Sequence, residues 1–167
     1  NLGGTVGSLG TDKERRPFVI PSKNLKVAPV ICYESAYGEF CSMYVREGAN
    51  LIFVITNDGW WGNTPGHRQH LTFSSMRAIE TRRCIARSAN TGISAFINQR
   101  GEVLQATPYW VETAIRQQIN ANDDITFYVR YGDYIARIAA FISVLLLMIT
   151  ISLLLMKRTG KFKPINV

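Results

Sequence analysis

The sequence predicts an α/β fold, with helices and strands layered around one core, followed by a single membrane-spanning helix. Two short, continuous apolar runs, at residues 25–32 and 50–56, have the length and composition of buried strands. Helix-forming stretches alternate with them, and the charge-free stretch 138–156 is long enough to cross a membrane. With 167 residues, the chain has room for one domain with a sizeable core.

The first half of the chain predicts a strand, a helix and a second strand. Residues 1–25 are rich in Gly, Lys and Arg, and we expect a loop or a broken edge there. The runs "LKVAPVIC" and "NLIFVIT" predict strands at 25–32 and 50–56, buried on both faces. Between them, "ESAYGEFCSMYVREGA" predicts a helix that stops near Gly48.

The second half predicts a long helix and then a hairpin. "NDGWWGNTPGH" (57–67) is rich in turn-forming residues and predicts a loop, and helix formers dominate at 69–89. "GISAFINQRGEVLQA" (92–106) predicts two strands around residues 99–101, and "TAIRQQINA" (113–121) alternates well enough for another strand. Strands that alternate with helices and close on a hairpin indicate an α/β layered sandwich.

The stretch 138–156 predicts a transmembrane helix. Its 19 residues carry no charge and would span about 28 Å, close to the hydrocarbon thickness of a bilayer. We therefore predict three parts: an extracytoplasmic domain (1–133), a membrane helix (134–156) and a cytoplasmic tail (157–167). The orientation follows from the positive charges that stay on the cytoplasmic side, Lys157, Arg158, Lys161 and Lys163.

The composition narrows the possible partners. The four tail residues account for more than half of the net charge of +7, so little basic surface remains for nucleic acid. Three cysteines without paired spacing argue against a disulfide scaffold, although the redox state of Cys41 and Cys84 stays open. The chain starts at Asn1 without a signal segment, and we expect it to be the C-terminal piece of a longer protein.

Cys32 is the candidate nucleophile. It ends a predicted strand and precedes a predicted helix, whose free N–H groups can stabilise a thiolate and receive an oxyanion. Glu34 lies two residues on, near enough to orient or deprotonate a partner group, and Glu39 lies seven residues on, where it could brace the turn. The alternative is a small apolar residue packed at a strand end.

Several segments together resemble one enzyme superfamily. "ICYESAYGE" resembles the nucleophile segment of the nitrilase (carbon–nitrogen hydrolase) superfamily, and "RAIETRRCIARSANTGISAFINQRGEV" (77–103) resembles its later helix and hairpin. "CYE", "TNDGWWG", Gln69-His70, "MRAIE" and "RSANTGISA" are similar, in order and spacing, to the membrane-bound branch, the apolipoprotein N-acyltransferases. The resemblance runs from about Val27 to the tail.

The resemblance implies both a fold and a reaction. The fold would be part of a nitrilase-like α-β-β-α sandwich followed by the membrane helix, in the bacterial inner membrane. Cys32 would take an acyl chain from a phospholipid as a thioester and pass it to the N-terminal diacylglyceryl-cysteine of a lipoprotein. Tyr33 and Glu34 would support the nucleophile, with the Tyr33 N–H as an oxyanion donor. No cofactor or metal is implied.

One departure from the family pattern bears on activity. The superfamily also uses a glutamate base and a lysine well upstream of the cysteine, but only Glu14 and three lysines precede Cys32, none in a matching motif. The multi-helix membrane part of the branch is missing as well. We therefore expect this chain to be inactive alone. A membrane-tethered amidase or nitrilase of small amides, or a non-catalytic anchored fragment, remain the alternatives.

The loop after residue 56 offers candidate substrate contacts. Trp60 and Trp61, with Asn57, could line a lipid pocket or seat the domain at the membrane interface, and ordinary loop packing is the alternative. His67 and His70 stand three apart, but no C-x-x-C or H-E-x-x-H pattern supports a zinc site. We expect His70 to cap or pack against its helix.

The predicted helix at 69–89 also carries supporting residues. Met76, Ile79 and Ala86 fall within one apolar stripe and predict a packed face. Arg83 falls inside that stripe, and Glu80 is close enough to pair with it; a structural ion pair is favoured over a substrate contact. Cys84, midway along the predicted helix, is expected to be a core residue, as is Cys41.

Overall fold

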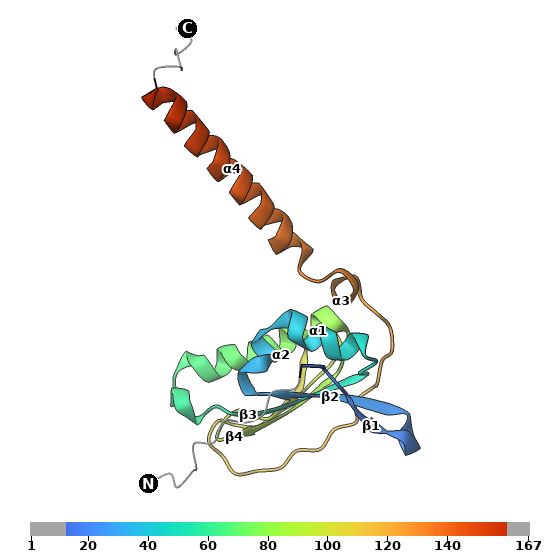
Figure 1. The fold of residues 1–167 in the computed structure, drawn as a ribbon. Coiled ribbons are helices and arrows are strands. Elements are labelled where there is room, and N and C mark those ends of the chain that lie inside the picture. The colour runs from blue at the N-terminus through green and yellow to red at the C-terminus, as the bar shows by residue number, and fades with distance from the viewer. Residues whose placement is uncertain (1–12, 160–167) are drawn as a thin grey trace. The chain divides into compact units, whose positions relative to one another are not determined.

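The computed structural model describes residues 13–159, and within them six strands form one mixed sheet in the order β1-β2-β3-β4-β5-β6 (Figure 1). The central strands β2, β3 and β4 run parallel, while β1, β5 and β6 pair antiparallel at the edges. The α/β fold class predicted from the alternating pattern is confirmed. The strands are β1 (Phe18–Ile20), β2 (Leu25–Ile31), β3 (Leu51–Asn57), β4 (Ile85–Asn90), β5 (Ala95–Ile97) and β6 (Val103–Ala106).

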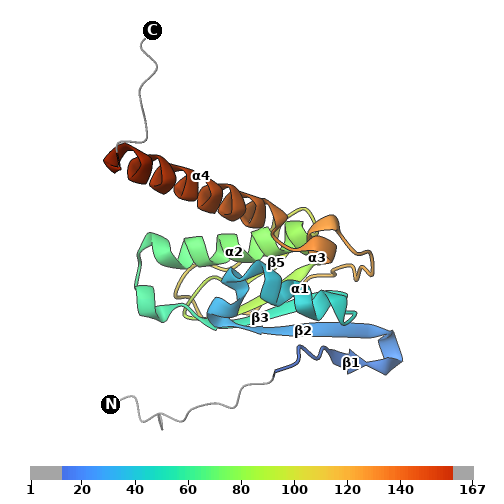
Figure 2. The same ribbon diagram turned by 45° about the horizontal axis from the view of Figure 1, so that its top comes forward.

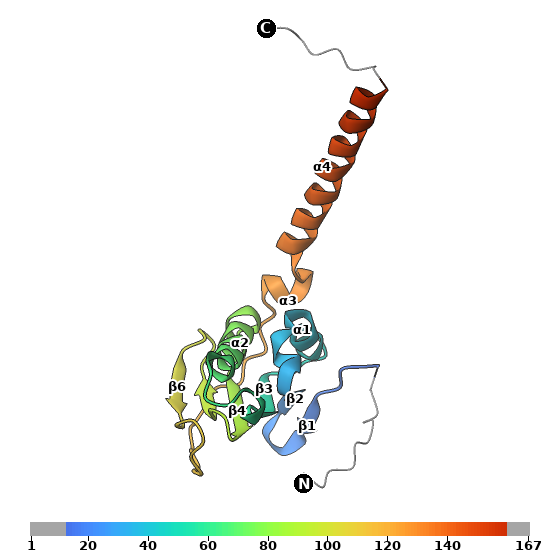
Figure 3. The ribbon, with the colours of Figure 1, turned by 90° about the vertical axis from the view of Figure 1, so that its left-hand side faces the viewer.

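Two helices cover one face of this sheet. They lie side by side along the strands, as Figures 2 and 3 show. They are α1 (Gly38–Arg46) and α2 (Pro65–Thr81), and three short 3-10 turns connect the elements: η1 (Pro21–Lys23), η2 (Cys32–Ala36) and η3 (Gly59–Trp61). The core lies between sheet and helices, where Val30, Ile52 and Val54 are almost fully buried.

A short third helix, α3 (Phe127–Tyr131), closes the helical layer. Arg46 donates from Nε to the Val129 carbonyl at 2.7 Å, and the Thr126 hydroxyl donates to the Glu80 carbonyl at 2.6 Å. These bonds join α3 to the ends of α1 and α2.

The opposite face of the sheet is covered little. In β3, Ile52 and Val54 are buried, but Phe53 and Ile55 are 39% and 59% exposed. The prediction that this strand is buried on both faces is therefore wrong for the described residues. They supply one helical layer and one sheet, which is half of an α-β-β-α sandwich.

The first predicted helix is shorter in the structure. It begins at Gly38 rather than residue 34, because Cys32–Ala36 forms the 3-10 turn η2. It ends at Arg46, and Gly48 follows with φ +92°, a conformation that glycine adopts without strain. Gly48 therefore stands where a helix stop was expected.

The predicted helix at 69–89 is in fact a helix and a strand. The helix begins earlier, at Pro65, where the Thr64 hydroxyl accepts the Gly66 N–H, and it ends at Thr81. Arg82 adopts a left-handed conformation, and the chain continues into β4. Cys84 thus precedes a strand instead of lying within a helix.

The packed face predicted for that helix is also wrong. Met76 and Ile79 are 43% and 48% exposed, and Ala86 belongs to β4.

The hairpin prediction is confirmed, whereas the strand predicted at 113–121 is wrong. β5 and β6 pair antiparallel around residues 98–102. Residues 113–121 form no strand. Part of this segment passes over the open sheet face, and Thr113 and Ile115 line a cavity of about 570 Å³ with Phe53 and Phe96.

The helix α4 (Tyr134–Arg158) belongs to a second unit of the chain, which starts at Asp133. The Asp133 carboxylate accepts the Ala136 N–H at 3.0 Å and caps the helix. The hydroxyls of Ser143 and Thr150 donate to carbonyls four residues earlier, both at 2.8 Å, so these polar groups are satisfied within the helix.

This helix is long and apolar enough to cross a membrane. Its 25 residues correspond to about 38 Å, and Lys157 and Arg158 form its basic end. The tail residues Lys161 and Lys163 lie outside the described residues.

Candidate active site

Cys32 lies directly after β2, at the sheet edge where the carboxyl ends of three parallel strands meet. The register pairs Ile31 with Ile55 and Asn57 with Asn90, so the turn at Cys32 lies beside the end of β3. Ligands of open α/β sheets bind at this edge. Cys32 is partly exposed and has φ +51°, a left-handed conformation that costs a non-glycine residue about 1–2 kcal/mol. Strain of this kind is often found at functional turns.

The other two cysteines are core residues, as predicted. Cys41 is fully buried and Cys84 is 4% exposed. Burial raises the pKa of the Cys41 thiol to about 12, against the opposing charge of Arg77. All three cysteines are free thiols, and Cys32 is therefore the one that a substrate can reach.

The turn after Cys32 is held by side chains of its own segment. The Ser35 hydroxyl donates to the Cys32 carbonyl at 2.9 Å, and Glu34 Oε2 accepts the Ile31 N–H at 2.8 Å. Glu34 is thus tied to the backbone that leads into Cys32. Tyr33 is about half-exposed, and its ring lies edge-on to an aromatic ring of α2.

Four polar side chains lie behind this turn, and we name them the Asp58 network: Thr56, Asp58, His70 and Arg87. Asp58 Oδ1 accepts the Thr56 hydroxyl and faces His70 Nδ1, both at 2.9 Å. Asp58 Oδ2 accepts a hydrogen bond from the Arg87 guanidinium at 2.7 Å. The side chains of Asp58, His70 and Arg87 are at most 1% exposed. The network therefore joins β3, α2 and β4 in the interior.

Hydrogen bonds and the charge of Arg87 keep the buried Asp58 carboxylate ionised. Burial alone would raise its pKa, but the hydrogen bond from His70, the charge of Arg87 and the bonds from Arg87 and Thr56 together lower the pKa below its ordinary value. Burial lowers the pKa of Arg87, and the carboxylate of Asp58 opposes that shift. Losing one partner of this buried ion pair would leave the other charge uncompensated.

The Asp58 network contacts the candidate nucleophile at two points. The Thr56 hydroxyl oxygen lies 3.3 Å from Cys32 Sγ. His70 Nε2 lies 3.2 Å from the Cys32 carbonyl oxygen and 3.1 Å from Ser35 Oγ. Both the sulfur and the backbone of Cys32 are thus held from the interior side.

Sequence reasoning missed most of this network. His70 was expected to cap or pack against its helix, but it lies in the second turn of α2 with both ring nitrogens in hydrogen-bond contact. Asp58 and Arg87 were not singled out. A usable signal existed for Thr56 and Asp58, which lie near and just after the carboxyl end of β3, the edge where sites of parallel sheets form. Arg87 lies farther back, opposite Val54 in the middle of the sheet, and position at the strand end does not indicate it.

The structure separates the two tryptophans of η3. Trp60 is 77% exposed, whereas the Trp61 ring centroid lies 5.3 Å from that of His70. Asn57 Oδ1 accepts the Gly59 N–H and the Thr91 hydroxyl, each at 3.1 Å, and so links the loops that follow β3 and β4. Trp61 therefore packs beside the Asp58 network, and Trp60 is the one of these two that is available to a ligand or a membrane.

The predicted ion pair between Glu80 and Arg83 is wrong. Arg83 lies beyond the end of α2 and is buried, where it donates to the carbonyls of Ala49, Thr81 and Asp124 at 2.8, 3.0 and 2.8 Å. Glu80 instead pairs with Arg77 at 2.8 Å.

Arg77 also donates to the Ala36 carbonyl at 2.9 Å, so it ties α2 to the end of η2. Arg77, and not Arg83, is therefore the arginine that supports the turn after Cys32. Glu39 lies exposed in the first turn of α1.

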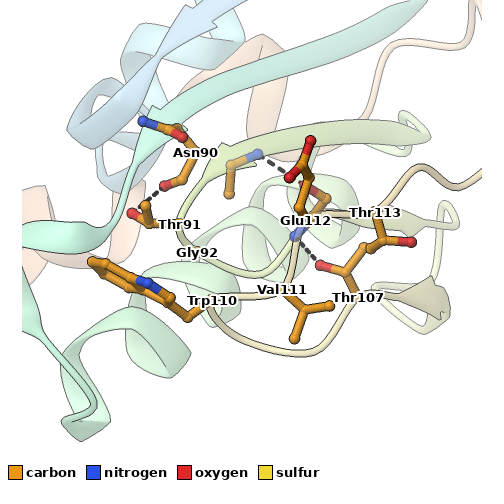
Figure 4. A pocket seen from close by; sticks show the side chains of 10 residues that line it. Asn90, Thr91, Gly92, Thr107, Trp110, Val111, Glu112 and Thr113 are labelled. Carbon is orange, nitrogen blue, oxygen red and sulfur yellow. Dashed lines mark hydrogen bonds between the residues drawn. The ribbon is translucent and has the colours of Figure 1, made fainter.

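A polar pocket of about 470 Å³ opens beyond the end of β4 (Figure 4). Its wall includes Thr91 and Trp110, both at φ +61°, and the Trp110 N–H donates to the Thr91 carbonyl at 3.2 Å. Gly92 also lines it, and a Cβ there would lie 2.5 Å from Asp58 Oδ2. A glycine is thus required for this loop to close over Asp58. Within residues 13–159, no group of three or more His, Cys, Asp or Glu side chains is placed to hold a metal ion.

Comparisons with known proteins agree with this arrangement. Residues 6–123 match the sequence profile of the carbon-nitrogen hydrolase family. Similar curated proteins include the apolipoprotein N-acyltransferases of Chlorobaculum tepidum, 36% identical over 68% of this chain and 21% of that protein, and of Thermotoga maritima, 39% identical over 68% and 23%. The chain spans about a fifth to a quarter of the length of these relatives.

Solved structures show the same fold. The crystal structure of a carbon-nitrogen hydrolase from Helicobacter pylori G27 matches with a TM-score of 0.55 and 14% identity, over 62% of this chain and 43% of that one. Because the profile of the family covers more than half of the residues, and the sheet and helices repeat its fold, this chain belongs to the carbon-nitrogen hydrolase family.

Proposed function

We propose that this chain carries the nucleophile part of an apolipoprotein N-acyltransferase. Such an enzyme moves a fatty acyl chain from a phospholipid, through a cysteine thioester, to the N-terminal diacylglyceryl-cysteine of a lipoprotein. The observation that carries the proposal is Cys32: a partly exposed thiol in a left-handed turn at the carboxyl end of a parallel strand, with a hydroxyl 3.3 Å from its sulfur. The relatives named apolipoprotein N-acyltransferase supply the reaction.

The first step of the proposed reaction is attack by the Cys32 thiolate on the ester carbonyl of the phospholipid. A new C–S bond forms, and negative charge develops on the carbonyl oxygen, where the Tyr33 N–H would donate a hydrogen bond. The tetrahedral intermediate collapses, the C–O bond breaks, and the leaving alkoxide takes a proton to give a lysophospholipid. The product on the protein is a thioester.

The second step transfers the acyl chain to the amine and regenerates the Cys32 thiolate. The α-amine of the diacylglyceryl-cysteine attacks the thioester carbonyl, the C–S bond breaks, and the amine loses a proton as the amide forms. We do not propose Glu34 as the base of either step, because its Oε2 accepts the Ile31 N–H and so holds the backbone that leads into Cys32. We propose that a glutamate base and a lysine outside these 167 residues complete the site, so that the isolated chain is inactive.

The surroundings of Cys32 suit a lipid substrate at a membrane. Tyr33 and Trp60 expose aromatic surface near the sheet edge, where an acyl chain would lie, and Asn57 is the candidate polar contact. The helix α4 would anchor the protein in the bacterial inner membrane, with the domain on the extracytoplasmic side and the C-terminus in the cytoplasm. Both substrates are lipids whose acyl chains stay in the bilayer.

The test is the mass of the Cys32 peptide after incubation with phospholipid vesicles. In the full-length protein that contains this chain, we expect an acyl adduct on Cys32, released by hydroxylamine, and none in Cys32→Ser. In the isolated 167-residue chain, we expect no adduct. Hydrolysis of small amides without an adduct would support a tethered amidase instead, and the absence of both reactions would leave a non-catalytic anchor.

A further inference from the structure

His70 is placed to act on Cys32 through the protein backbone. It is 1% exposed and lies between two sets of partners. Its Nδ1 is 2.9 Å from Asp58 Oδ1 and 3.2 Å from the Arg87 guanidinium, and its Nε2 is 3.2 Å from the Cys32 carbonyl oxygen. The ring thus spans from the buried ion pair to the turn that holds the sulfur.

The partners decide which contacts are attractive. A carboxylate and a carbonyl oxygen only accept hydrogen bonds, so both contacts are attractive when each ring nitrogen carries a proton, with Nδ1 donating to Asp58 and Nε2 donating to the Cys32 carbonyl. Ser35 is a second donor to that carbonyl, because its hydroxyl donates to it at 2.9 Å. Its oxygen also lies 3.1 Å from Nε2, so the Nε2 proton is shared between the Ser35 hydroxyl oxygen and the Cys32 carbonyl oxygen. The Cys32 carbonyl therefore has two donors aimed at it.

We propose that His70 is a positioning residue for Cys32, oriented by Asp58 and Arg87. The left-handed turn at Cys32, with φ +51°, is unfavourable for a cysteine, and a strained conformation persists only where neighbouring groups hold it. Hydrogen bonds to the Cys32 carbonyl supply that hold, and so keep Sγ at 3.3 Å from the Thr56 hydroxyl. The role rests on the proposed function of Cys32, but His70 itself need not touch the substrate.

The competing explanation is purely structural: His70 only satisfies the buried pair of Asp58 and Arg87. Two substitutions separate the explanations, because each amide reproduces one end of the ring. In His70→Asn, the amide can replace Nδ1 and donate to Asp58, but it does not reach Cys32. In His70→Gln, the longer side chain can replace Nε2 and donate to the Cys32 carbonyl.

The readout is the rate at which iodoacetamide alkylates Cys32 in the detergent-solubilised chain at pH 7, followed by peptide mass. Cys41 and Cys84 are buried and serve as internal references. If His70 positions Cys32, alkylation slows about tenfold or more in His70→Asn and less than threefold in His70→Gln, since small displacements of a reacting atom have large effects on rate. Equal rates in the two variants, or a slower His70→Gln, would overturn the proposal.

Two further variants distinguish a specific effect on Cys32 from a general loss of folding. His67→Asn is the matched control, because His67 is also 1% exposed on α2 but stacks on Tyr109 instead of contacting the Cys32 turn. We expect it to alkylate at the wild-type rate, and a tenfold slowing in it would attribute the effect to general loosening of α2. If neither His70 variant folds, the test uses Ser35→Ala, which removes the other hydrogen bond to the Cys32 carbonyl. Slower alkylation of Cys32 in this variant supports the positioning role, and an unchanged rate contradicts it.

In the full-length protein, positioning predicts that His70→Asn lowers kcat for thioester formation with little change in KM. Failure of the proposed function remains distinguishable from failure of this inference. If the wild-type protein takes no acyl chain but the two His70 variants still alkylate at the expected different rates, the acyltransferase proposal fails and the positioning role stands.

Discussion

The Thr56 hydroxyl oxygen lies 3.3 Å from Cys32 Sγ and 2.9 Å from Asp58 Oδ1. One hydroxyl carries one proton, so Thr56 can donate to only one of these groups at a time. With a neutral thiol, Thr56 donates to Asp58 and accepts from the sulfur. With a thiolate, it can turn and donate to the sulfur, while Asp58 keeps its bonds from His70 and Arg87. Thr56 is thus placed to stabilise the ionised nucleophile.

We expect Thr56→Val to slow thioester formation on Cys32 by about 10- to 100-fold, because a hydrogen bond to a charged group contributes about 1.5–3 kcal/mol. Thr56→Ser keeps the hydroxyl and is the matched control, with a rate within about threefold of wild type. Single-turnover kinetics with phospholipid in the full-length protein measure both rates. Equal rates for Val and Ser would show that the hydroxyl does not act on the sulfur.

Asp58 makes a pH-dependent contribution to stability. Its pKa is lower in the folded state than the ordinary value of 3.8, so the ionised form stabilises the fold fully above that value. This stabilisation is lost as the pH falls through the lower, folded-state pKa. At pH 7, Asp58→Asn should therefore lower the free energy of unfolding by about 3–5 kcal/mol, because Arg87 loses its charged partner. Below pH 4, the variant should lose less additional stability than wild type, because it has no carboxylate to protonate.

Thermal unfolding in detergent between pH 2.5 and pH 7 tests this prediction. Glu102→Gln is the control, because Glu102 also has a lowered pKa, caused by Asn98 and Arg100, but pairs with Arg100 on the surface. We expect its unfolding temperature to stay close to wild type. An Asp58→Asn curve parallel to that of wild type across the acid range would refute the role of the carboxylate.

Local patterns predicted the parts of this fold that depend on neighbouring residues. The apolar runs of β2 and β3, the turn at Cys32 and the hairpin of β5 and β6 are each encoded within a few positions. The boundary between α2 and β4 was missed because the left-handed residue there is Arg82, without the glycine that usually marks a helix end. The residues after it, "IARSAN", extend into a strand because they pair with β3.

The Asp58 network was missed for a different reason. Asp58, His70 and Arg87 come from three elements and meet only when β3 and β4 are placed in register. Arg83 was misassigned in the same way, since its partners are carbonyls from residues 49, 81 and 124, far apart in the sequence. The segment 113–121 has an alternating pattern but forms no strand. Such a pattern forms a strand only where the edge of another strand is available for pairing.

The two tryptophans should respond differently to substitution. Trp61 packs beside His70 and against Gly66, so Trp61→Ala should lower the unfolding temperature. Trp60 is mostly exposed, so Trp60→Ala should leave the unfolding temperature unchanged but slow thioester formation about fivefold at low phospholipid concentration, equivalent to about 1 kcal/mol of lost lipid contact. A normal reaction rate in Trp60→Ala would assign that side chain no role in lipid use.

The charges that flank α4 predict the direction in which it crosses the membrane. Lys157 and Arg158 end the helix, and basic residues are retained on the cytoplasmic side. In spheroplasts, a membrane-impermeant maleimide should label Ile125→Cys before lysis and Thr159→Cys only after lysis, both in a Cys32→Ser background. Cys41 and Cys84 are buried and should stay unlabelled in the folded protein. Labelling of Thr159→Cys in intact spheroplasts would place Cys32 in the cytoplasm, on the opposite side from the lipoprotein substrate, and would exclude the proposed reaction.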